Sequence, residues 1–155
     1  MTRNSAMAAL VLVALALSAC DERHEMAGNP KVCADFKLAK ANVPTVVAGA
    51  EGAAPVDDCV RKWAYSLAAS HDAAATVAEA AVAACNVQLA RWNQQALSQP
   101  GADIEASSVT TGQPTTPLAE HSAFTSARAL LYVVQARAGN CAPPPITNGV
   151  PDGVS

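Results

Sequence analysis

The feature that most constrains the fold of this chain is a set of four cysteines, at Cys33, Cys59, Cys85 and Cys141. A fifth cysteine, Cys20, stands apart because it closes an apolar segment near the start of the chain. An even number of cysteines in an exported protein favours disulfides, and four cysteines can pair in three ways. The choice among these pairings depends on where the helices lie.

The segment before Cys20 has the features of a secretory leader. Arg3 is its only charge, and residues 6–17 contain neither a charge nor a proline. A membrane-spanning helix needs about 20 apolar residues, so we expect residues 1–19 to be a cleaved signal peptide and not a permanent anchor. The alternative is an ordinary secreted protein that is cleaved elsewhere and keeps Cys20 as a spare thiol.

The leader ends in a specific motif, Leu17-Ser18-Ala19-Cys20. It resembles the lipobox of bacterial lipoproteins, which are cleaved just before the cysteine after diacylglycerol has been attached to it. The resemblance implies that Cys20 is the lipidation site and that acyl chains such as palmitate attach the protein to a membrane. Each buried CH₂ group contributes about 0.8 kcal/mol, so two or three acyl chains suffice for stable attachment.

Asp21 follows the cysteine directly. An aspartate at this position resembles the signal that keeps enterobacterial lipoproteins on the inner membrane, although other lineages sort differently. The resemblance therefore favours the periplasmic face of the inner membrane. Residues 20–30 are mostly polar, so we expect a short lipid-anchored tether that does not fold by itself. A single domain is expected over residues 31–142.

Apolar residues that recur at helical spacing predict one helix over residues 56–69 and a longer one over residues 73–97. Ser70 is expected to cap the longer helix, and the short link predicts an antiparallel hairpin. The apolar face of the first helix holds Val56, Val60, Trp63 and Leu67. That of the second holds Ala74, Val77, Ala81, Cys85, Leu89, Trp92 and Ala96.

The hairpin favours one pairing of the cysteines. Cys59 lies about 11 residues before the turn and Cys85 about 14 residues after it, an axial offset of about 4.5 Å at 1.5 Å per residue. Both cysteines point towards the contact between the helices, so we expect Cys59 to pair with Cys85 and Cys33 with Cys141. Helix boundaries shifted by a few residues would change the offset by several ångströms, so the other pairings stay open.

A third strong helix is expected to begin at Pro117, with Thr116 as its cap, and to end at Gly139 and Asn140. Its predicted buried face consists of Ala123, Phe124, Ala127, Leu130, Leu131 and Val134. We expect a weaker helix from Asn29 to before Pro44 and a short extended piece at residues 45–48. Residues 98–117 are interpreted as a disordered, solvent-facing loop, with a functional loop as the alternative. Residues 143–155 are interpreted as a disordered, proline-rich tail.

The predicted fold class is therefore all-α. We expect a small antiparallel bundle of three to four helices, stapled by two disulfides, with a flexible N-terminal tether and a flexible C-terminal tail. Alanine dominates the apolar residues and only 4% of the chain is aromatic, which predicts thin, closely packed helices.

Candidate residues for chemistry each have a simpler structural interpretation. His71 and Asp72 are a possible polar pair at an active turn, but a helix-capping turn explains both. His121, Thr125, Arg128 and Tyr132 share one helix face, which fits a ligand or partner surface and also an ordinary solvated face. Ser107 and Ser108 have no histidine nearby in sequence that would form a triad with an acid, and nothing in the sequence supports a triad assembled in space. Trp63 and Trp92 can line a ligand site but fit helix packing better. We assign no catalytic, cofactor-binding or metal-binding residue, and expect no cofactor.

A second resemblance covers residues 59–85, where "CVRKWAYSLA" precedes "AAVAAC". The segment is similar to a cysteine-containing hairpin in small exported, alanine-rich proteobacterial proteins whose function is not assigned. It carries over no catalytic residue.

The net charge of −3 and the lack of a basic stripe argue against nucleic acid as a partner. The anchor and the lack of a recognisable catalytic set favour a non-catalytic structural or interaction module of the cell envelope, whose protein partner is unknown. The alternative is a small periplasmic hydrolase or transferase with a site that the sequence does not reveal.

Overall fold

The computed structural model describes residues 28–36, 52–100, 106–108 and 111–154. The described chain is mostly helical and contains two disulfides, which confirms the all-α, disulfide-stapled fold. Its α-helices are α2 (Ala53–Leu67), α3 (Ala74–Ala84), α4 (Asn86–Leu97) and α5 (Pro117–Gly139). None of the helices described is long and apolar enough to cross a membrane. The leader, Cys20, Asp21 and residues 45–48 lie outside the described residues.

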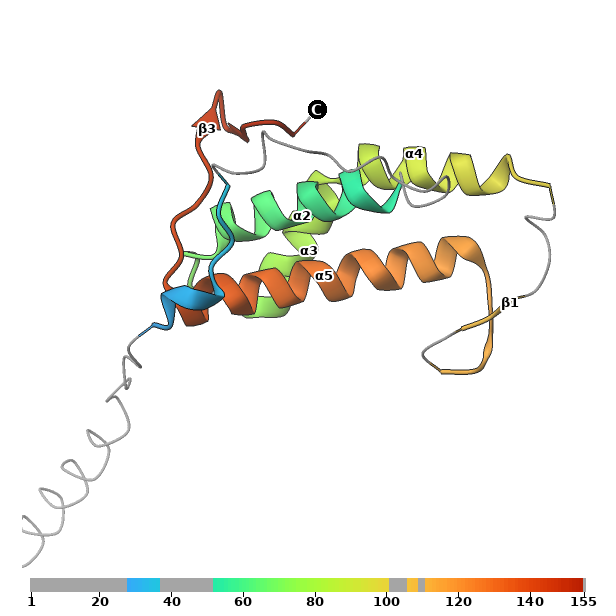
Figure 1. Cartoon of the computed structure of the whole chain (residues 1–155), viewed down its shortest axis with the longest axis horizontal. Coiled ribbons are helices and arrows are strands. Elements are labelled where there is room, and N and C mark those ends of the chain that lie inside the picture. The colour runs from blue at the N-terminus through green and yellow to red at the C-terminus, as the bar shows by residue number, and fades with distance from the viewer. Residues whose placement is uncertain (1–27, 37–51, 101–105, 109–110, 155) are drawn as a thin grey trace, which may run out of the picture.

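Helix α5 is the central element of the bundle, because it contacts α2, α3 and α4 (Figure 1). Helix α2 lies along it and α3 crosses behind it. Most core side chains are small, so the helices can approach closely, as the alanine-rich composition predicts. The core contains Val56, Val60, Ala64 and Tyr65 of α2, Val77, Ala78 and Ala81 of α3, and Ala129, Val133 and Ala136 of α5.

Helices α2 and α3 are joined by a short turn and contact each other, and the two cysteines of the predicted hairpin are bonded. Cys59 and Cys85 form a disulfide with their Cα atoms 5.9 Å apart, and both are buried in the core. This is the pairing that the hairpin geometry favours. It leaves Cys33 and Cys141 as the second pair, and these are bonded as well.

The prediction of one continuous helix over residues 73–97 is wrong, because the helix breaks at Cys85. Cys85 has φ −104° and ψ 15°, and its N–H donates to the Val82 carbonyl at 3.0 Å instead of to the residue four back. The apolar spacing continues across the break, so periodicity could not reveal it. The change of direction allows α4 to contact α5, through Trp92 among other side chains.

The predicted cap of the second helix is also wrong. Helix α3 begins at Ala74, and its N-cap residue, Ala73, makes no side-chain hydrogen bond. Ser70 lies in the turn before it, where its hydroxyl accepts from the Asp72 N–H at 3.2 Å. Ser70 therefore stabilises the turn and not the first helical residues.

The ends of α5 are as predicted, but its buried face is not. Thr116 accepts from the Ala119 N–H at 3.3 Å, and Asn140 closes the helix in a left-handed conformation with φ 50°. The residues predicted to be buried are exposed, with Phe124 only half-buried; Leu130 is 41% exposed, and Leu131 and Val134 are each 50% exposed. The opposite face is buried instead, through Thr125, Ala129, Tyr132, Val133 and Ala136.

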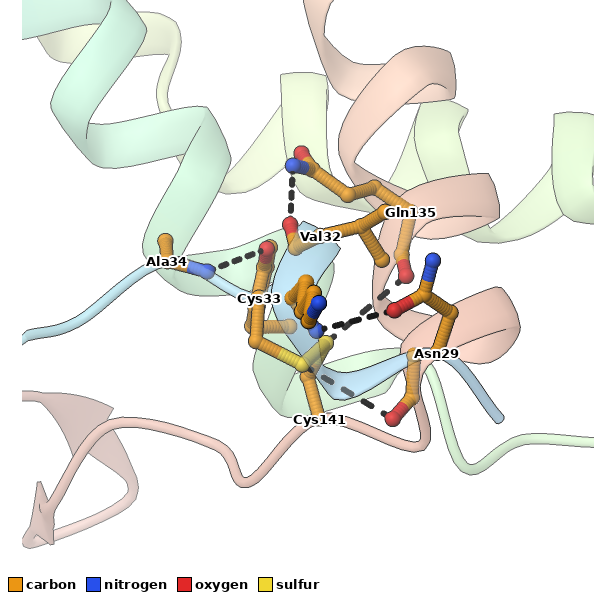
Figure 2. The surroundings of a disulfide bond; sticks show 9 residues. Asn29, Val32, Cys33, Ala34, Gln135 and Cys141 are labelled. Atoms are coloured by element: carbon orange, nitrogen blue, oxygen red, sulfur yellow. Dashed lines mark hydrogen bonds between the residues drawn. A yellow bond between two sulfur atoms is a disulfide. The ribbon is translucent and has the colours of Figure 1, made fainter. Parts of the chain in front are cut away.

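The weaker helix expected after Asn29 is reduced to one 3₁₀ turn, η2 (Pro30–Val32), within the described residues. The chain then becomes extended at Cys33, which bonds to Cys141 with the Cα atoms 5.5 Å apart (Figure 2). The extended backbone is held by Tyr65 of α2, whose hydroxyl accepts from the Ala34 N–H at 3.0 Å. These tertiary bonds compete with the continuation of the helix.

Gly139 is required where this disulfide meets the end of α5. A Cβ atom at this position would lie 2.5 Å from the Cys141 sulfur and 2.7 Å from the Cys33 sulfur, closer than atoms can approach. The glycine that ends the helix therefore also makes room for the disulfide.

The segment predicted to be a disordered tail is an ordered hairpin over most of its length, with β3 (Ile146–Thr147) antiparallel to β4 (Val150–Pro151). Asn148 and Gly149 have φ of 53° and 80°, the conformation that a two-residue hairpin turn needs. The Asn-Gly pair was a signal for this hairpin that the proline-rich composition obscured. Lys62 of α2 holds the end of the hairpin by donating to the Gly153 carbonyl at 3.1 Å.

The loop of residues 98–117 is also more ordered than predicted in its described part. Strand β1 (Ala106–Ser107) pairs with β2 (Pro114–Thr115) in a short antiparallel ribbon just before α5. Residues 101–105 and 109–110 are not described.

Candidate functional site

Several of the polar residues that are candidates for chemistry lie where the buried face of α5 contacts α2 and α4. The sequence grouped His121, Thr125, Arg128 and Tyr132 on one face, and the structure places that face inwards. Thr125 is fully buried, and its hydroxyl donates to the His121 carbonyl at 2.7 Å. The interpretation of this face as solvated is therefore wrong. Its side chains are positioned by partners on other helices.

The first group of residues, called here the Asp57 cluster, consists of Asp57, Arg128 and Tyr132. Arg128 Nε donates to Asp57 Oδ1 at 2.6 Å and Nη2 donates to Oδ2 at 3.3 Å, a two-point ion pair between α5 and α2. The Tyr132 hydroxyl lies 2.9 Å from each carboxylate oxygen and also bonds to Arg128. One carboxylate thus binds two residues that lie one turn apart on α5.

The Asp57 cluster shifts the ionisation of its α5 members. Burial, followed by the hydrogen bond to Asp57, raises the pKa of Tyr132 to about 12. The hydrogen bond to Asp57 raises the pKa of Arg128, with burial acting in the opposite direction. Tyr132 therefore stays neutral and Arg128 charged at any physiological pH, so neither can act as a general base there.

The second group, called here the Trp92 cluster, joins α4 to the N-terminal half of α5. The Trp92 and His121 rings stack with centroids 3.5 Å apart and planes at 14°, and Phe124 meets Trp92 edge-on at 5.6 Å. His121 Nδ1 lies 2.8 Å from Asn93 Oδ1. Burial lowers the pKa of His121, which favours the neutral ring at neutral pH.

The start of α2 closes over the Trp92 cluster. A Cβ atom at Gly52 would lie 2.0 Å from a carbon of the Trp92 ring, so only glycine fits here. This close approach fills the space beside the indole with backbone. The aromatic stack is therefore a packing contact between helices in this structure, as the sequence interpretation of Trp92 favoured.

The remaining candidate residues do not join either cluster. His71 and Asp72 are exposed in the turn between α2 and α3. Ser108 belongs to the ribbon before α5, where its hydroxyl accepts from the Thr111 N–H at 3.4 Å. Trp63 packs against the core, and its indole N–H is buried without a hydrogen-bond partner among the described residues.

A cavity of about 190 Å³ lies on the other side of α2, beside the Cys59–Cys85 disulfide. Asp58 contributes a carboxylate, which already pairs with Lys62 at 2.6 Å and with Arg61 at 2.5 Å. Within the described part of the chain, no three His, Cys, Asp or Glu residues come together as metal ligands. The cavity is lined by Pro55, Asp58, Cys59, Gln88, Gly153 and Val154.

Comparison with protein-family models, with curated proteins and with solved structures finds no match. A function for this chain is therefore inferred from its own sequence and structure.

Sequence reasoning missed Asp57 and Asn93 as partners of the α5 face. No local signal links either to α5, because the links span 71 and 28 residues along the chain.

Proposed function

We propose that this chain is a lipid-anchored module of the bacterial envelope that acts by binding a partner and not by catalysis. One observation carries the proposal. The polar side chains of α5 bond to α2 and α4, while its opposite face exposes apolar side chains to solvent. Leu131 and Val134 are both 50% exposed on that face. Contiguous exposed apolar residues of this kind mark interaction surfaces.

The two disulfides support an exported location, because structural disulfides persist in oxidising compartments and are rare in the cytosol. The anchor itself is proposed from the lipobox-like motif that ends at Cys20, and the inner membrane from Asp21. The disulfides then serve a small domain whose alanine-rich core buries few large side chains.

The two clusters support a structural role for the residues that looked most reactive. A hydrolase or transferase of this size would need an acid, base or nucleophile that can reach a substrate. Asp57 instead accepts bonds from Arg128 and Tyr132, and His121 is stacked on Trp92. These interactions explain the positions of the side chains, and no catalysed reaction is needed to explain them.

The anchor is tested by labelling cells with a radioactive fatty acid. We expect label in the wild-type chain and none in the Cys20→Ala variant. Equal incorporation in the two would contradict lipidation at Cys20.

The binding role is tested with a photocrosslinking amino acid placed at Leu131 in the native envelope. We expect a discrete crosslinked product from Leu131. The matched control is the same amino acid at Val87, an exposed position on α4 that is 57% accessible and lies off the α5 face. If Leu131 gives no more product than Val87, the proposed binding face is wrong.

A further inference from the structure

The exposed face of α5 has the spacing of a coiled-coil contact. Ala123, Ala127, Leu130 and Val134 follow one another at intervals of four, three and four residues, and each is exposed. Apolar residues that alternate at intervals of three and four residues form a seam along one side of a helix, which can pack against a second helix. The buried residues of α5 lie on the opposite face.

The two ends of this seam carry opposite charges, which favours one orientation of a second helix over the other. Continuing the same spacing leads to Glu120 at the N-terminal end and Arg137 at the C-terminal end. Arg137 is held in place, because its Nε and Nη2 donate to the carbonyls of Ala68, Ser70 and Asp72 at 2.9 to 3.0 Å. Its Nη1 is therefore the atom expected to reach a partner.

The seam is complementary to itself when a second helix runs antiparallel. In one register Ala123 lies opposite Val134 of the second copy, Ala127 opposite Leu130, and Glu120 opposite Arg137. Each layer then combines a small residue with a large one or an acid with a base, which keeps two helices at a constant separation of about 8–10 Å. A parallel pair would instead place Glu120 against Glu120 and Leu130 against Leu130.

We propose that a second copy of this chain occupies the exposed face of α5 and forms an antiparallel α5–α5 pair. The inference rests on the proposed binding function and names its partner. The seam from Glu120 to Arg137 is about 25 Å long at 1.5 Å per residue, so it buries less than the ~800 Å² per partner of a standard interface. Association is therefore weak in dilute solution and depends on the high effective concentration of copies on one membrane.

The test uses two differently tagged full-length copies expressed together, one carrying Ala123→Cys and the other Val134→Cys. The antiparallel register brings these two positions together, so we expect a disulfide-linked mixed dimer on a non-reducing gel. Two copies of Ala123→Cys would be separated by about 16 Å along the axis, beyond the ~7 Å that a disulfide tolerates. The same-residue dimer should therefore be scarce.

Three variants control the result. Val87→Cys, exposed on α4, should give no dimer and shows that a new thiol alone is not enough. Leu130→Glu in both copies should lower the mixed dimer at least about tenfold, because a buried unpaired charge is costly. Glu120→Gln should lower it roughly twofold in the antiparallel pair, as loss of a surface ion pair does, but raise it in a parallel pair.

Four results would overturn the proposal. A dominant Ala123→Cys homodimer would show that the pair is parallel. Full labelling of both thiols by a water-soluble maleimide, without any dimer, would show that this face of α5 is exposed to solvent and binds no partner. Protection of the thiols without dimer would indicate that the face lies on the lipid. A crosslink to another protein would retain the binding function and exclude the second copy as partner.

Discussion

Among single residues, Asp57 is the side chain on which the contact between α2 and α5 depends most. Its carboxylate binds Arg128 and Tyr132 together and so holds α2 against α5. Arg128 and Asp57 keep 37% and 27% of their side-chain surface exposed, so solvent weakens the ion pair without removing it. The interaction is a helix contact made from polar groups, and it explains why polar residues occupy the buried face of α5.

The first prediction concerns this carboxylate. Asp57→Ala should lower the free energy of unfolding by about 1–2 kcal/mol, because the half-buried Arg128 and the Tyr132 hydroxyl lose their acceptor. The control is Glu79→Ala at an exposed position of α3, which should change stability by less than about 0.5 kcal/mol. Urea unfolding followed by circular dichroism measures both, and equal effects would show that the cluster contributes nothing to the fold.

The second prediction concerns the pH dependence of Tyr132. Its folded pKa of about 12 lies above the ordinary value of 10.0, so the fold favours the neutral hydroxyl. The stabilisation is complete below pH 10 and is lost as the pH rises towards 12. The free energy of unfolding of Tyr132→Phe should therefore fall less steeply with rising pH than that of the wild type over this range.

Ultraviolet absorbance after a rapid pH jump checks the same residue directly. The tyrosinate signal of the wild type minus that of Tyr132→Phe should rise with a midpoint near pH 12. A midpoint near the ordinary tyrosine value would mean that Asp57 and burial do not act on this hydroxyl.

At the scale of elements, α5 decides how the bundle is arranged. It has apolar residues on both faces, and the face with Ala129, Val133 and Ala136 is the buried one. These side chains are smaller than Leu130 and Leu131 on the exposed face. Small residues let α2 and α3 approach, and the polar groups beside them find partners there.

The third prediction distinguishes the two faces of α5. Val133→Ala should lower the free energy of unfolding by about 1–3 kcal/mol, because it leaves a cavity in a fully buried site. Leu130→Ala removes more atoms but from an exposed site, so the monomer should lose less than about 0.5 kcal/mol. Thermal unfolding at low protein concentration measures both variants. A larger loss for Leu130→Ala would support the buried face that the sequence alone predicted.

At the scale of the whole molecule, the two disulfides act over different distances. Cys59–Cys85 spans 26 residues within one hairpin, whereas Cys33–Cys141 spans 108 residues and ties the start of the described chain to the end of α5. Hydrogen bonds accompany the longer link, including that from the Asn29 N–H to the Ala138 carbonyl at 3.0 Å and one from Gln135 to Val32 (Figure 2). This link places the first described residues, from residue 28 on, beside the C-terminal end of α5 (Figure 1).

The fourth prediction concerns this long-range link. Cys33→Ser combined with Cys141→Ser should destabilise the domain by about 3–5 kcal/mol, since a closed loop of this length restricts the unfolded chain strongly. Helical circular dichroism should persist at low temperature, because the core of α2, α3 and α5 and the other disulfide remain. Denaturant unfolding measures the change, and an unaltered midpoint would show that the hydrogen bonds alone hold the segment.

Local sequence patterns were enough to predict the features that depend on near neighbours along the chain. Helical spacing located α2 and α5 closely, Thr116 and Pro117 marked the start of α5, and the position of the turn brought Cys59 level with Cys85. The sequence also grouped His121, Arg128 and Tyr132 on one face. Each of these follows from backbone geometry within a few turns of helix.

The direction in which these elements face depends on contacts between distant parts of the chain. The break at Cys85 occurs where a buried, crosslinked residue directs α4 towards α5. The polar face of α5 is buried because Asp57 and Asn93, from distant parts of the chain, supply hydrogen-bond partners for it. A local pattern ranks a polar face as exposed, since burying unpaired polar groups is costly, and that cost disappears once partners from other helices satisfy them.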